Sequence, residues 1–296
     1  MGLFKEFHKT NRLIARRETP HDVSSPIVKI SGLSVRYNGQ LALEGISFDL
    51  NPGERVAVVG PNGAGKSTLF KVIAGVLKPG EGTVDIYGHE PGGHFCIAYL
   101  PQRSLVDWNF PVSVADVVMM GRISQLGLLR QPRNRDWEKV NQALEVVRLA
   151  DLSKRQISEL SGGQQQRMFI ARALAQEAEL MLMDEPFSGL DANSQEQLYD
   201  IFEELRHRKV TVLVALHDLK VAAERFDRVI LLNRLLLGFG RPQEIFTAER
   251  LTSAYGSHLR LVSLPEVLKA GTPDGKPTDF LAVEDTCCDD LEGQHA

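Results

Sequence analysis

The residues best suited to chemistry lie in Gly60–Thr68, a glycine-rich stretch that fits the phosphate-binding pattern G-x-x-x-x-G-K-[ST]. Backbone N–H groups of such a loop can converge on phosphate oxygens, because glycine carries no Cβ that would block their approach. Lys66 would reach the β- and γ-phosphates of a nucleotide, and the Ser67 hydroxyl would ligate Mg²⁺. The residues predicted to bind the nucleotide here are Gly60, Pro61, Asn62, Gly63, Ala64, Gly65, Lys66, Ser67 and Thr68.

The sequence around this loop predicts a strand before it and a helix after it. Arg55–Val59 is a short β-branched run between two glycine-containing turns, which is typical of a buried parallel strand. Leu69–Ala74 predicts the beginning of a helix that Gly75 can end. A helix N-terminus behind the loop would add a partial positive charge. An ordinary glycine-rich surface turn would not need a buried strand before it and a helix after it. We therefore expect this loop to bind a nucleotide.

Two polar side chains directly follow other predicted core strands. Phe95–Leu100 predicts a buried strand that ends just before Gln102, whose side chain can reach a Mg²⁺ or its water, although this signal alone is weak. Val210–Leu216 predicts another buried strand, which ends at His217. A lone histidine is usually structural. At the end of a core strand, however, His217 is a candidate contact for a γ-phosphate.

Two neighbouring acids end a third predicted core strand. The apolar run Leu180–Asp184 closes with Asp184 and is followed by Glu185. An acid at the end of a buried strand beside a phosphate loop can hold Mg²⁺, directly or through water. The next acid can polarise the attacking water. The alternative, an ordinary solvated strand end, is disfavoured because Pro186 and Ser188–Asp191 follow in a defined order.

A second anion-binding arrangement is predicted at Leu160–Gln164, which we call the signature segment. Exposed amides, a hydroxyl and a helix dipole would all point one way there. A chain with two phosphate-binding helix starts suggests a site assembled from two chains. The candidate residues of this segment are Ser161, Gly162, Gly163 and Gln164.

The remaining patterns predict the elements that position these residues. Ile27–Leu50 predicts two strands joined by a hairpin turn at Asn38-Gly39. Tyr37 beside this turn is either an ordinary strand aromatic or a residue that stacks on adenine. Residues 104–178 lose strand signals and gain helical periodicity, which predicts an inserted helical lobe. We expect an α/β fold: a phosphate-loop core with a mixed, mainly parallel sheet, an N-terminal antiparallel β subdomain and this inserted helical subdomain.

Composition restricts the class of protein. The chain has 296 residues, of which 43% are hydrophobic and 24% charged, and its formal net charge is −4. This balance is typical of a globular protein and shows no nucleic-acid footprint. The three cysteines, Cys96, Cys287 and Cys288, form no disulfide framework and no zinc spacing. No apolar run is long enough to cross a bilayer, so we expect any work at a membrane to go through a partner.

The two ends of the chain are predicted to lie outside the main domain. Residues 1–26 are basic and weakly amphipathic, and we favour a flexible extension over a membrane-surface anchor. Residues 246–296 predict short helices followed by an acidic, disordered tail. Cys287, Cys288 and His295 could instead hold a soft metal, but adjacent thiols lack the usual spacing of a metal site. The domain itself would span residues 27–245.

These motifs, in this order and spacing, resemble those of the ATP-binding cassette ATPases. The resemblance covers about residues 27–245 and implies a head-to-tail dimer with two ATP molecules at its interface. It implies that the phosphate loop holds the phosphates and that Tyr37 stacks on adenine. Gln102 and Asp184 would serve Mg²⁺ together with Ser67, and Glu185 would act as general base.

The resemblance also implies roles for the remaining candidates. His217 would contact the γ-phosphate and act with Glu185 and Gln102 as a catalytic group. The signature segment would close the site from the other chain, and Asp191 would couple the two sites. Nucleotide state would then bias a two-state element, because ADP lacks the γ-phosphate contacts.

Two stretches resemble a narrower group, the ATPases of manganese, zinc and iron importers. They are Asp107–Arg122 and Glu185–Asp191, the latter with Phe187 where many cassettes carry threonine. Manganese is the closest match. The resemblance implies a peripheral subunit on the cytoplasmic face of the cell membrane, bound through its helical lobe to integral permease subunits. An extracytoplasmic metal-binding protein would be an indirect partner.

Two other functions remain to be weighed. One is a soluble cassette ATPase of a cytosolic assembly or remodelling complex, which would not associate stably with a polytopic membrane protein. The other is a phosphate-loop kinase acting on a small molecule. The signature segment argues against the kinase, because a kinase has no use for a segment supplied by another chain.

Overall fold

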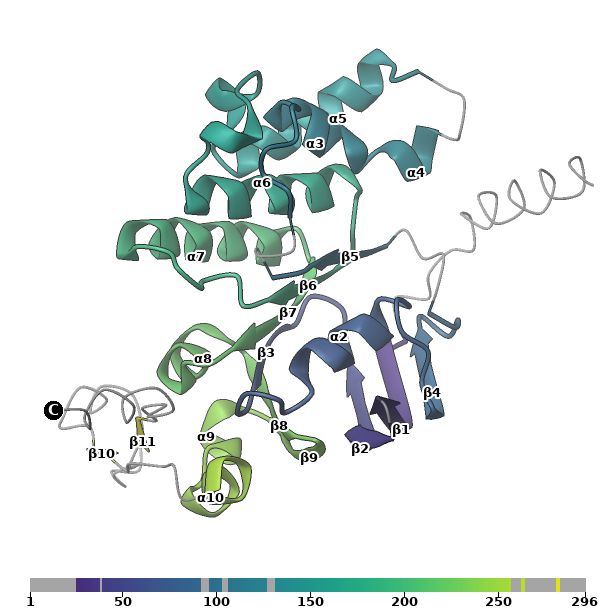
Figure 1. Cartoon of the computed structure of the whole chain (residues 1–296), viewed down its shortest axis with the longest axis vertical. Coiled ribbons are helices and arrows are strands. Elements are labelled where there is room, and N and C mark those ends of the chain that lie inside the picture. Colours follow the sequence, from purple (N-terminus) through teal and green to yellow (C-terminus); the bar gives the residue numbers. More distant parts are fainter. Residues whose placement is uncertain are drawn as a thin grey trace, which may run out of the picture.

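The computed structural model describes residues 25–37, 39–91, 96–102, 106–126, 131–256, 262–263 and 281–282. The predictions for residues 1–24 and for most of 257–296, including Cys287, Cys288 and His295, lie outside the described residues. Figure 1 shows a helical lobe standing over one side of a central sheet, with a smaller sheet and α2 on the other side. The strands are β1 (Val28–Tyr37), β2 (Gln40–Leu50), β3 (Arg55–Val59), β4 (Glu81–Ile86), β5 (Ile97–Leu100), β6 (Leu180–Asp184), β7 (Thr211–Leu216), β8 (Arg228–Asn233), β9 (Leu235–Gly240), β10 (Val262–Ser263) and β11 (Leu281–Ala282).

The central sheet has six strands in the order β5-β6-β7-β3-β8-β9. Its first five strands are parallel to one another, and only β9 pairs antiparallel, with β8. In the register, Leu100 of β5 lies opposite Met183 of β6, and Asp184 lies opposite Ala215 of β7. The carboxyl ends of these strands therefore meet at one edge of the sheet, where ligands bind in open α/β folds. The predicted mixed, mainly parallel sheet is confirmed.

The smaller sheet is antiparallel, with the order β2-β1-β4. Tyr37 pairs with Gln40, so β1 and β2 are the paired antiparallel strands predicted from the sequence. β4 joins this sheet although it follows α2 in the chain. A backbone hydrogen bond from Glu44 N to the Arg234 carbonyl oxygen, 2.9 Å long, connects β2 to the central sheet.

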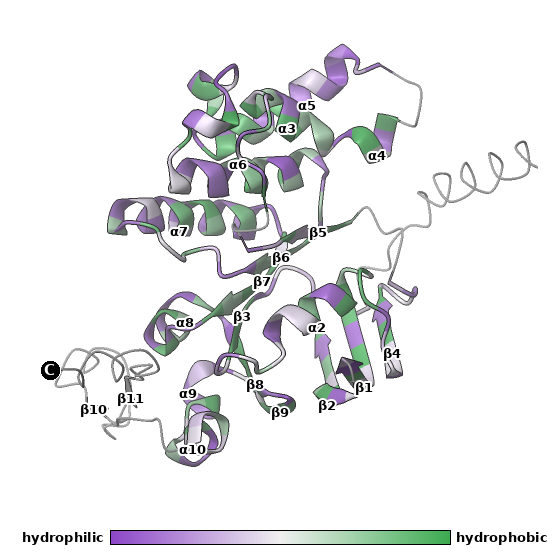
Figure 2. Ribbon diagram, in the orientation of Figure 1, coloured by the Kyte–Doolittle hydropathy of each residue, from purple (hydrophilic) through white to green (hydrophobic). Residues whose placement is uncertain are grey.

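Alternating side chains divide the core between the two faces of the central sheet. Ala57 and Val59 of β3 belong to the hydrophobic cluster shared with the helical lobe. Val56 and Val58 belong to the cluster shared with α2 and the smaller sheet. Every residue of β3, β6 and β7 is buried, as expected for parallel strands covered on both faces. The apolar colouring of these strands is visible in Figure 2.

The described part of residues 104–178 is helical, as predicted. Its apolar faces are also as predicted, because Val114, Val117 and Val118 are buried, as are Val140 and Leu144. α3 and α5 pack on α6. The elements of this lobe are α3 (Val114–Met120), α4 (Ile123–Leu126), α5 (Asn134–Val146), the 3₁₀ turns η3 (Ala150–Leu152) and η4 (Ile157–Glu159), and α6 (Gly162–Ala175).

Four more helices complete the core and its C-terminal side: α7 (Ala192–His207), α8 (Leu219–Arg225), α9 (Pro242–Ile245) and α10 (Ala248–Tyr255). The last two confirm the short helices predicted after β9. The helix behind the phosphate loop, α2 (Lys66–Ile73), starts three residues before the predicted Leu69. The reason is that Gly65, at φ +98°, is already the N-cap, and its carbonyl accepts from Leu69 N at 2.9 Å. Among the described residues, no helix is long and apolar enough to cross a membrane.

Candidate nucleotide-binding and hydrolysis site

The phosphate loop connects the carboxyl end of β3 to the N-terminus of α2. Two of its glycines leave no room for a side chain. A Cβ on Gly65 would lie 2.7 Å from the Ala42 carbonyl oxygen and 2.5 Å from Leu43 Cδ2. A Cβ on Gly60 would lie 1.9 Å from the Leu232 carbonyl oxygen. The loop is therefore wedged between the two sheets, and its amides and the start of α2 form a cradle for an anion.

The lysine of this loop is buried against the loop backbone. Lys66 Nζ donates to the carbonyl oxygens of Gly60, at 2.7 Å, and Pro61, at 3.1 Å. The next residue, Ser67, hydrogen-bonds through its side chain to the Asp184 carboxylate. The first turn of α2 thus carries a cation and a hydroxyl to the same strand edge as Asp184.

Asp184 ends β6 in a buried position. Burial raises the pKa of its carboxyl above the usual range, and so does the neighbouring Glu185 charge, while the Ser67 hydrogen bond and Lys66 oppose the rise. Tyr99 of β5 donates its hydroxyl to this carboxylate. Burial, followed by the Asp184 charge and this bond, raises the Tyr99 pKa to about 12. Tyr99 was missed in the sequence, where it reads as one more apolar residue of a core strand.

Glu185 receives two polar side chains from neighbouring strand ends. Its Oε1 lies 2.6 Å from His217 Nε2, and its Oε2 accepts from Gln102 Nε2 at 3.0 Å. Glu185 also has a φ of +52°, in the left-handed region that non-glycine residues rarely adopt. Such strain, about 1–3 kcal/mol, persists where the surroundings fix the conformation and is frequent at functional sites. The three candidates Gln102, Glu185 and His217 are thus brought together as a contiguous group.

The signature segment begins α6. Ser161 is its N-cap, with a capping box to Gln164: the Ser161 hydroxyl accepts from Gln164 N, and the Gln164 side chain accepts from Ser161 N. Gly163 is pressed against α7, since a Cβ there would lie 2.6 Å from Ser194 Oγ. Ser194 in turn donates through N and Oγ to Asp191, both at 2.9 Å. These bonds lower the Asp191 pKa. Ser194, also missed in the sequence, joins two predicted site residues.

A pocket of about 140 Å³ lies between the start of α6 and the loop after β6. Gln102, Gly162, Glu185 and Ser188 contribute to its lining. Tyr37, by contrast, lies at the end of the β1–β2 hairpin and is 40% exposed. The predicted residues form two groups within one chain. One is the phosphate loop with Asp184, and the other is the signature segment with Asp191. Each group borders Glu185 or the loop that follows β6.

The fold and these loops define a phosphate-loop nucleoside-triphosphatase. Residues 43–188 match the family model described as ABC transporter. The chain is 44% identical over 233 residues, 78% of its own length and 93% of the relative, to the manganese transport system ATP-binding protein MntB of Bacillus subtilis (strain 168). The chain belongs to the ABC transporter ATP-binding proteins.

Other relatives give the same family. The zinc transport system ATP-binding protein TroB of Treponema pallidum (strain Nichols) is 41% identical over 250 residues, 84% of this chain and 94% of that protein. Among solved structures, a transporter assigned to the metal-chelate type of ABC transporter, in an inward-facing conformation, is similar with a TM-score of 0.71. It is 32% identical, and the match covers 81% of this chain and 92% of that one.

Proposed function

We propose that this chain hydrolyses ATP to power a membrane permease that imports a divalent transition metal, manganese first, with zinc and iron next. The observation that carries the proposal is the convergence of Gln102 and His217 on Glu185, at strand ends beside a phosphate loop. The relatives named for manganese and zinc transport support the cargo. The metal is cargo of the permease, so no residue of this chain is assigned to it.

ATP would bind with its phosphates on the loop amides and Lys66. The closely packed Gly60 and Gly65 support this, because contacts with Leu232 and Ala42 hold the loop backbone in one conformation at the end of β3. Lys66 Nζ, which contacts two loop carbonyls, would turn to the β- and γ-phosphates. Tyr37, exposed at the hairpin end, would stack on the adenine ring.

Mg²⁺ fits the oxygen groups at this strand edge. The Ser67 hydroxyl and the Asp184 carboxylate are hydrogen-bonded to each other, and oxygen donors are the ligands that Mg²⁺ prefers. With Gln102 they would hold the ion, which would neutralise charge on the phosphates. The Tyr99 hydroxyl would fix the Asp184 carboxylate through a further hydrogen bond.

Glu185 would act as general base. Its carboxylate would accept a proton from the water whose oxygen attacks the γ-phosphorus, while the bond to the bridging oxygen breaks and ADP leaves. His217 would hold Glu185 in place and contact the γ-phosphate, and Gln102 would steady the other carboxylate oxygen. Such fixed partners matter because a base must lie within hydrogen-bond reach of the proton it removes.

A second copy of the chain would complete each site. α2 packs in the hydrophobic cluster on one face of the central sheet, whereas α6 packs in the cluster on the other face. Figure 1 shows the two helices on opposite sides of the sheet. This separation supports a head-to-tail dimer, in which the signature segment of one chain meets the phosphate loop of the other. Asp191 would couple the two sites.

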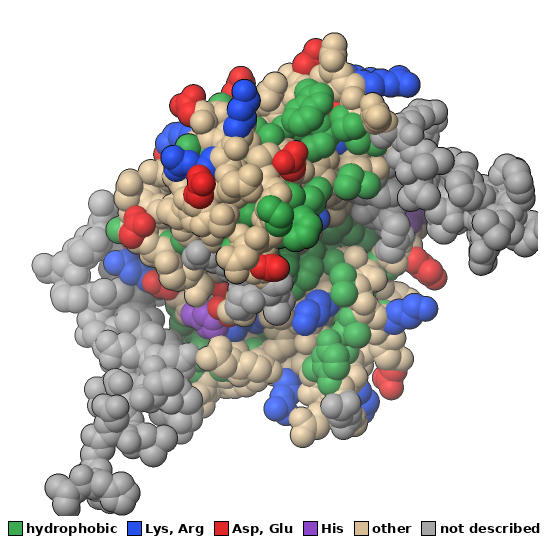
Figure 3. All heavy atoms as spheres, turned by 45° about the horizontal axis from the view of Figure 1, so that its top comes forward, with side chains coloured by type: hydrophobic (Ala, Val, Ile, Leu, Met, Phe, Trp, Pro, Cys, Tyr) green, Lys and Arg blue, Asp and Glu red, His purple; other side chains and the backbone are tan. Residues whose placement is uncertain are grey.

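The helical lobe would dock the permease near Gln102, on the cytoplasmic face of the membrane. Figure 3 shows hydrophobic side chains gathered over the lobe and along its boundary with the sheet region. Phe110 and Ile123 are 57% and 59% exposed and would add apolar area to such a contact. A net charge of −4 supports a protein partner over nucleic acid. An extracytoplasmic metal-binding protein would act through the permease.

The test is co-purification of the tagged chain from native membranes in mild detergent. We expect a polytopic permease to accompany both the parent chain and Glu185→Gln, and only the parent to restore cell manganese, zinc or iron in a deletion strain. A chain recovered only with cytosolic proteins would overturn the transport proposal and indicate an assembly or remodelling ATPase instead.

A further inference from the structure

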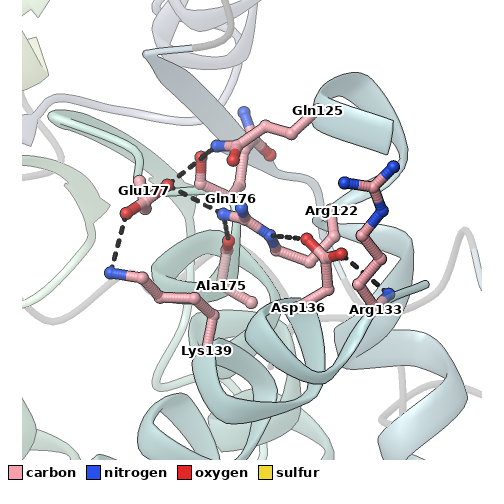
Figure 4. Close-up of polar contacts among 8 residues, drawn as sticks. All are labelled: Arg122, Gln125, Arg133, Asp136, Lys139, Ala175, Gln176 and Glu177. Carbon is pink, nitrogen blue, oxygen red and sulfur yellow. Dashed lines mark hydrogen bonds and ion pairs between the residues drawn. The ribbon is translucent and has the colours of Figure 1, made fainter. Parts of the chain in front are cut away.

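A buried arginine joins three segments of the helical lobe (Figure 4). Arg122 follows α3 and is only 4% exposed. Its Nε donates to Oδ1 of Asp136 on α5 at 3.4 Å. Its Nη1 donates at 2.8 Å to the Ala175 carbonyl oxygen at the end of α6, and at 2.8 Å to Glu177 Oε2. An arginine buried to this degree needs such partners, because an unpaired charge in a protein interior is costly.

Glu177 contacts three side chains of the helical lobe. Besides Arg122, it contacts Gln125 Nε2 at 3.0 Å and Lys139 Nζ at 2.9 Å. Burial alone would raise its pKa, but the hydrogen bonds from Arg122, Lys139 and Gln125 outweigh burial and lower the pKa to about 2. Its φ of +61° belongs to the turn that ends α6, where Glu177 N donates to the Leu174 carbonyl oxygen and Ala178 N to the Ala173 carbonyl oxygen. We call Arg122, Gln125, Asp136, Lys139 and Glu177 the Arg122 cluster.

The backbone before Arg122 lies directly against the last turns of α6. A Cβ on Gly121 would lie 2.2 Å from the Arg172 carbonyl oxygen and 3.1 Å from Gln176 N. Only glycine fits between the end of α3 and α6. The cluster is therefore built at the C-terminal end of α6, where a cation also complements the helix dipole and the free carbonyls.

The same end of α6 is tied to the edge strand of the central sheet. Gln176 Nε2 donates to the Ile97 carbonyl oxygen of β5 at 2.8 Å. The amides of Glu179 and Leu180 both donate to the Cys96 carbonyl oxygen, at 2.8 and 3.0 Å. From this junction, β5 leads toward Gln102. α6, with 14 residues, leads back over about 21 Å to the signature segment.

We propose that Arg122 is a positioning residue for ATP hydrolysis: it locks the end of α6 to α5, beside the bonds of Gln176 and Glu179 to the start of β5, and so sets where the signature segment meets the partner's nucleotide. The proposal rests on the proposed function, since it assumes the two-chain site. Arg122 does not line the pocket beside Glu185. It acts through α6, because a small tilt at one end of a 14-residue helix displaces the other end most.

The Arg122 cluster differs from the apolar packing of the lobe because one side chain, Arg122, donates three of its hydrogen bonds. Without Arg122, Asp136 loses its buried ion pair and the Ala175 carbonyl loses its donor, whereas Glu177 keeps Lys139 and Gln125. The phosphate loop leads into α2, which packs on the other face of the sheet, and the loop contacts of Lys66 do not involve the Arg122 cluster. Loss of Arg122 is therefore expected to leave ATP binding at the phosphate loop unchanged and to weaken the contact between the signature segment and the partner's nucleotide.

The experiment compares Glu185→Gln with Glu185→Gln/Arg122→Gln, at a temperature well below the Tm of both. We expect each monomer to bind ATP with the same Kd within twofold. ATP-driven dimer formation, followed by light scattering over a protein dilution series, should weaken about 3- to 30-fold in the double variant. In the chain with Glu185 intact, Arg122→Gln should lower kcat and leave the KM for ATP unchanged.

Three further variants separate this role from simple destabilisation. Arg155→Gln removes an exposed ion pair with Glu159 on the same lobe and should change nothing. Arg122→Lys, which keeps the charge but cannot span all the acceptors, should restore dimer formation in part. If Arg122→Gln does not fold, Glu177→Gln takes its place, because it keeps the Arg122 bonds to Asp136 and Ala175 and weakens the contacts made at position 177. It should weaken dimer formation in the same direction.

Equal dimer formation with and without Arg122, or an ATP Kd that weakens as much as dimer formation does, would overturn the positioning role. Failure of the proposed two-chain site would give a different result. If Glu185→Gln alone stays monomeric with ATP while Arg122 is intact, the proposed two-chain site is wrong, and the role of Arg122 falls with it.

Discussion

Glu185 Oε1 and His217 Nε2 lie 2.6 Å apart, although 32 positions separate the two residues in the chain. The parallel register of β6 and β7 brings them together, because Asp184 lies opposite Ala215. Glu185 directly follows Asp184, and His217 comes two positions after Ala215. The contact therefore depends on the sheet and not on a flexible loop. The same edge also receives Gln102 from β5, so three adjacent strands build one group.

His217→Ala should lower ATP turnover about 100-fold, a typical contribution of a group that supports acid–base catalysis. The ATP Kd should change less than twofold, because Lys66 and the loop amides are untouched. His207→Ala, at the exposed end of α7, is the control and should keep parental turnover. Single-turnover hydrolysis and equilibrium ATP binding measure the two effects. Parental turnover in His217→Ala would remove this residue from the mechanism.

Gly65→Ala should abolish ATP binding and lower the free energy of unfolding. The new Cβ meets the Ala42 carbonyl oxygen at 2.7 Å, and a φ of +98° is unfavourable for alanine, so the loop has to move. Gly32→Ala is the matched control, since Gly32 has φ +61° but nothing within 4 Å of the new Cβ. It should cost about 1–2 kcal/mol of stability and keep ATP binding. Urea unfolding and calorimetric titration test both. Normal ATP affinity in Gly65→Ala would contradict the dependence of ATP binding on this loop conformation.

Tyr99→Phe should raise the Mg²⁺ concentration needed for half-maximal ATPase activity about tenfold, with kcat at saturating Mg²⁺ nearly unchanged. The variant removes the hydroxyl that fixes the Asp184 carboxylate, and such supporting bonds typically contribute 10- to 100-fold to metal affinity. Tyr87→Phe makes the same chemical change at a hydroxyl that bonds Glu179, and its Mg²⁺ dependence should match the parent. An unchanged Mg²⁺ dependence in Tyr99→Phe would argue against Asp184 as an ion ligand.

Acid should weaken the lobe through Glu177. Its folded pKa of about 2 lies below the ordinary 4.5, so its contribution to stability is fully present above about pH 4.5 and is lost as the pH falls toward 2. Glu177→Gln should remove this part of the pH dependence and flatten the curve over that window. Unfolding free energies measured from pH 7 down to pH 3 test the sign. Parallel curves for parent and variant would contradict the ion-paired state of Glu177.

Much of the site could be predicted because its chemistry is carried by local patterns. The phosphate loop and the acids after β6 are contiguous in sequence, and their strand contexts follow from short β-branched or apolar runs. Tyr99, Ser194 and Arg122 could not be predicted in this way. Each acts through a residue distant in the chain, Asp184, Gly163 and Glu177 respectively, and only the strand order and helix packing bring the partners together.

The early start of α2 has a local physical cause. Helical periodicity begins at Leu69 because the preceding residues are polar, but Gly65 closes the first turn before the apolar pattern starts. The pairing of β4 with β1, by contrast, has no local cause in the sequence. Nothing in its six residues specifies a partner strand, and the pairing is set by where the chain returns after α2.

Glu185 is proposed to drive hydrolysis of ATP held between two chains, and the variant Glu185→Gln is the decisive test of this role. The purified variant should bind ATP, lose turnover by about 10²- to 10⁴-fold and become a dimer with ATP but not with ADP. Adding Lys66→Ala should abolish that dimer. Hydrolysis at the parental rate in Glu185→Gln would exclude Glu185 as the general base, and a monomer in saturating ATP would exclude the two-chain site.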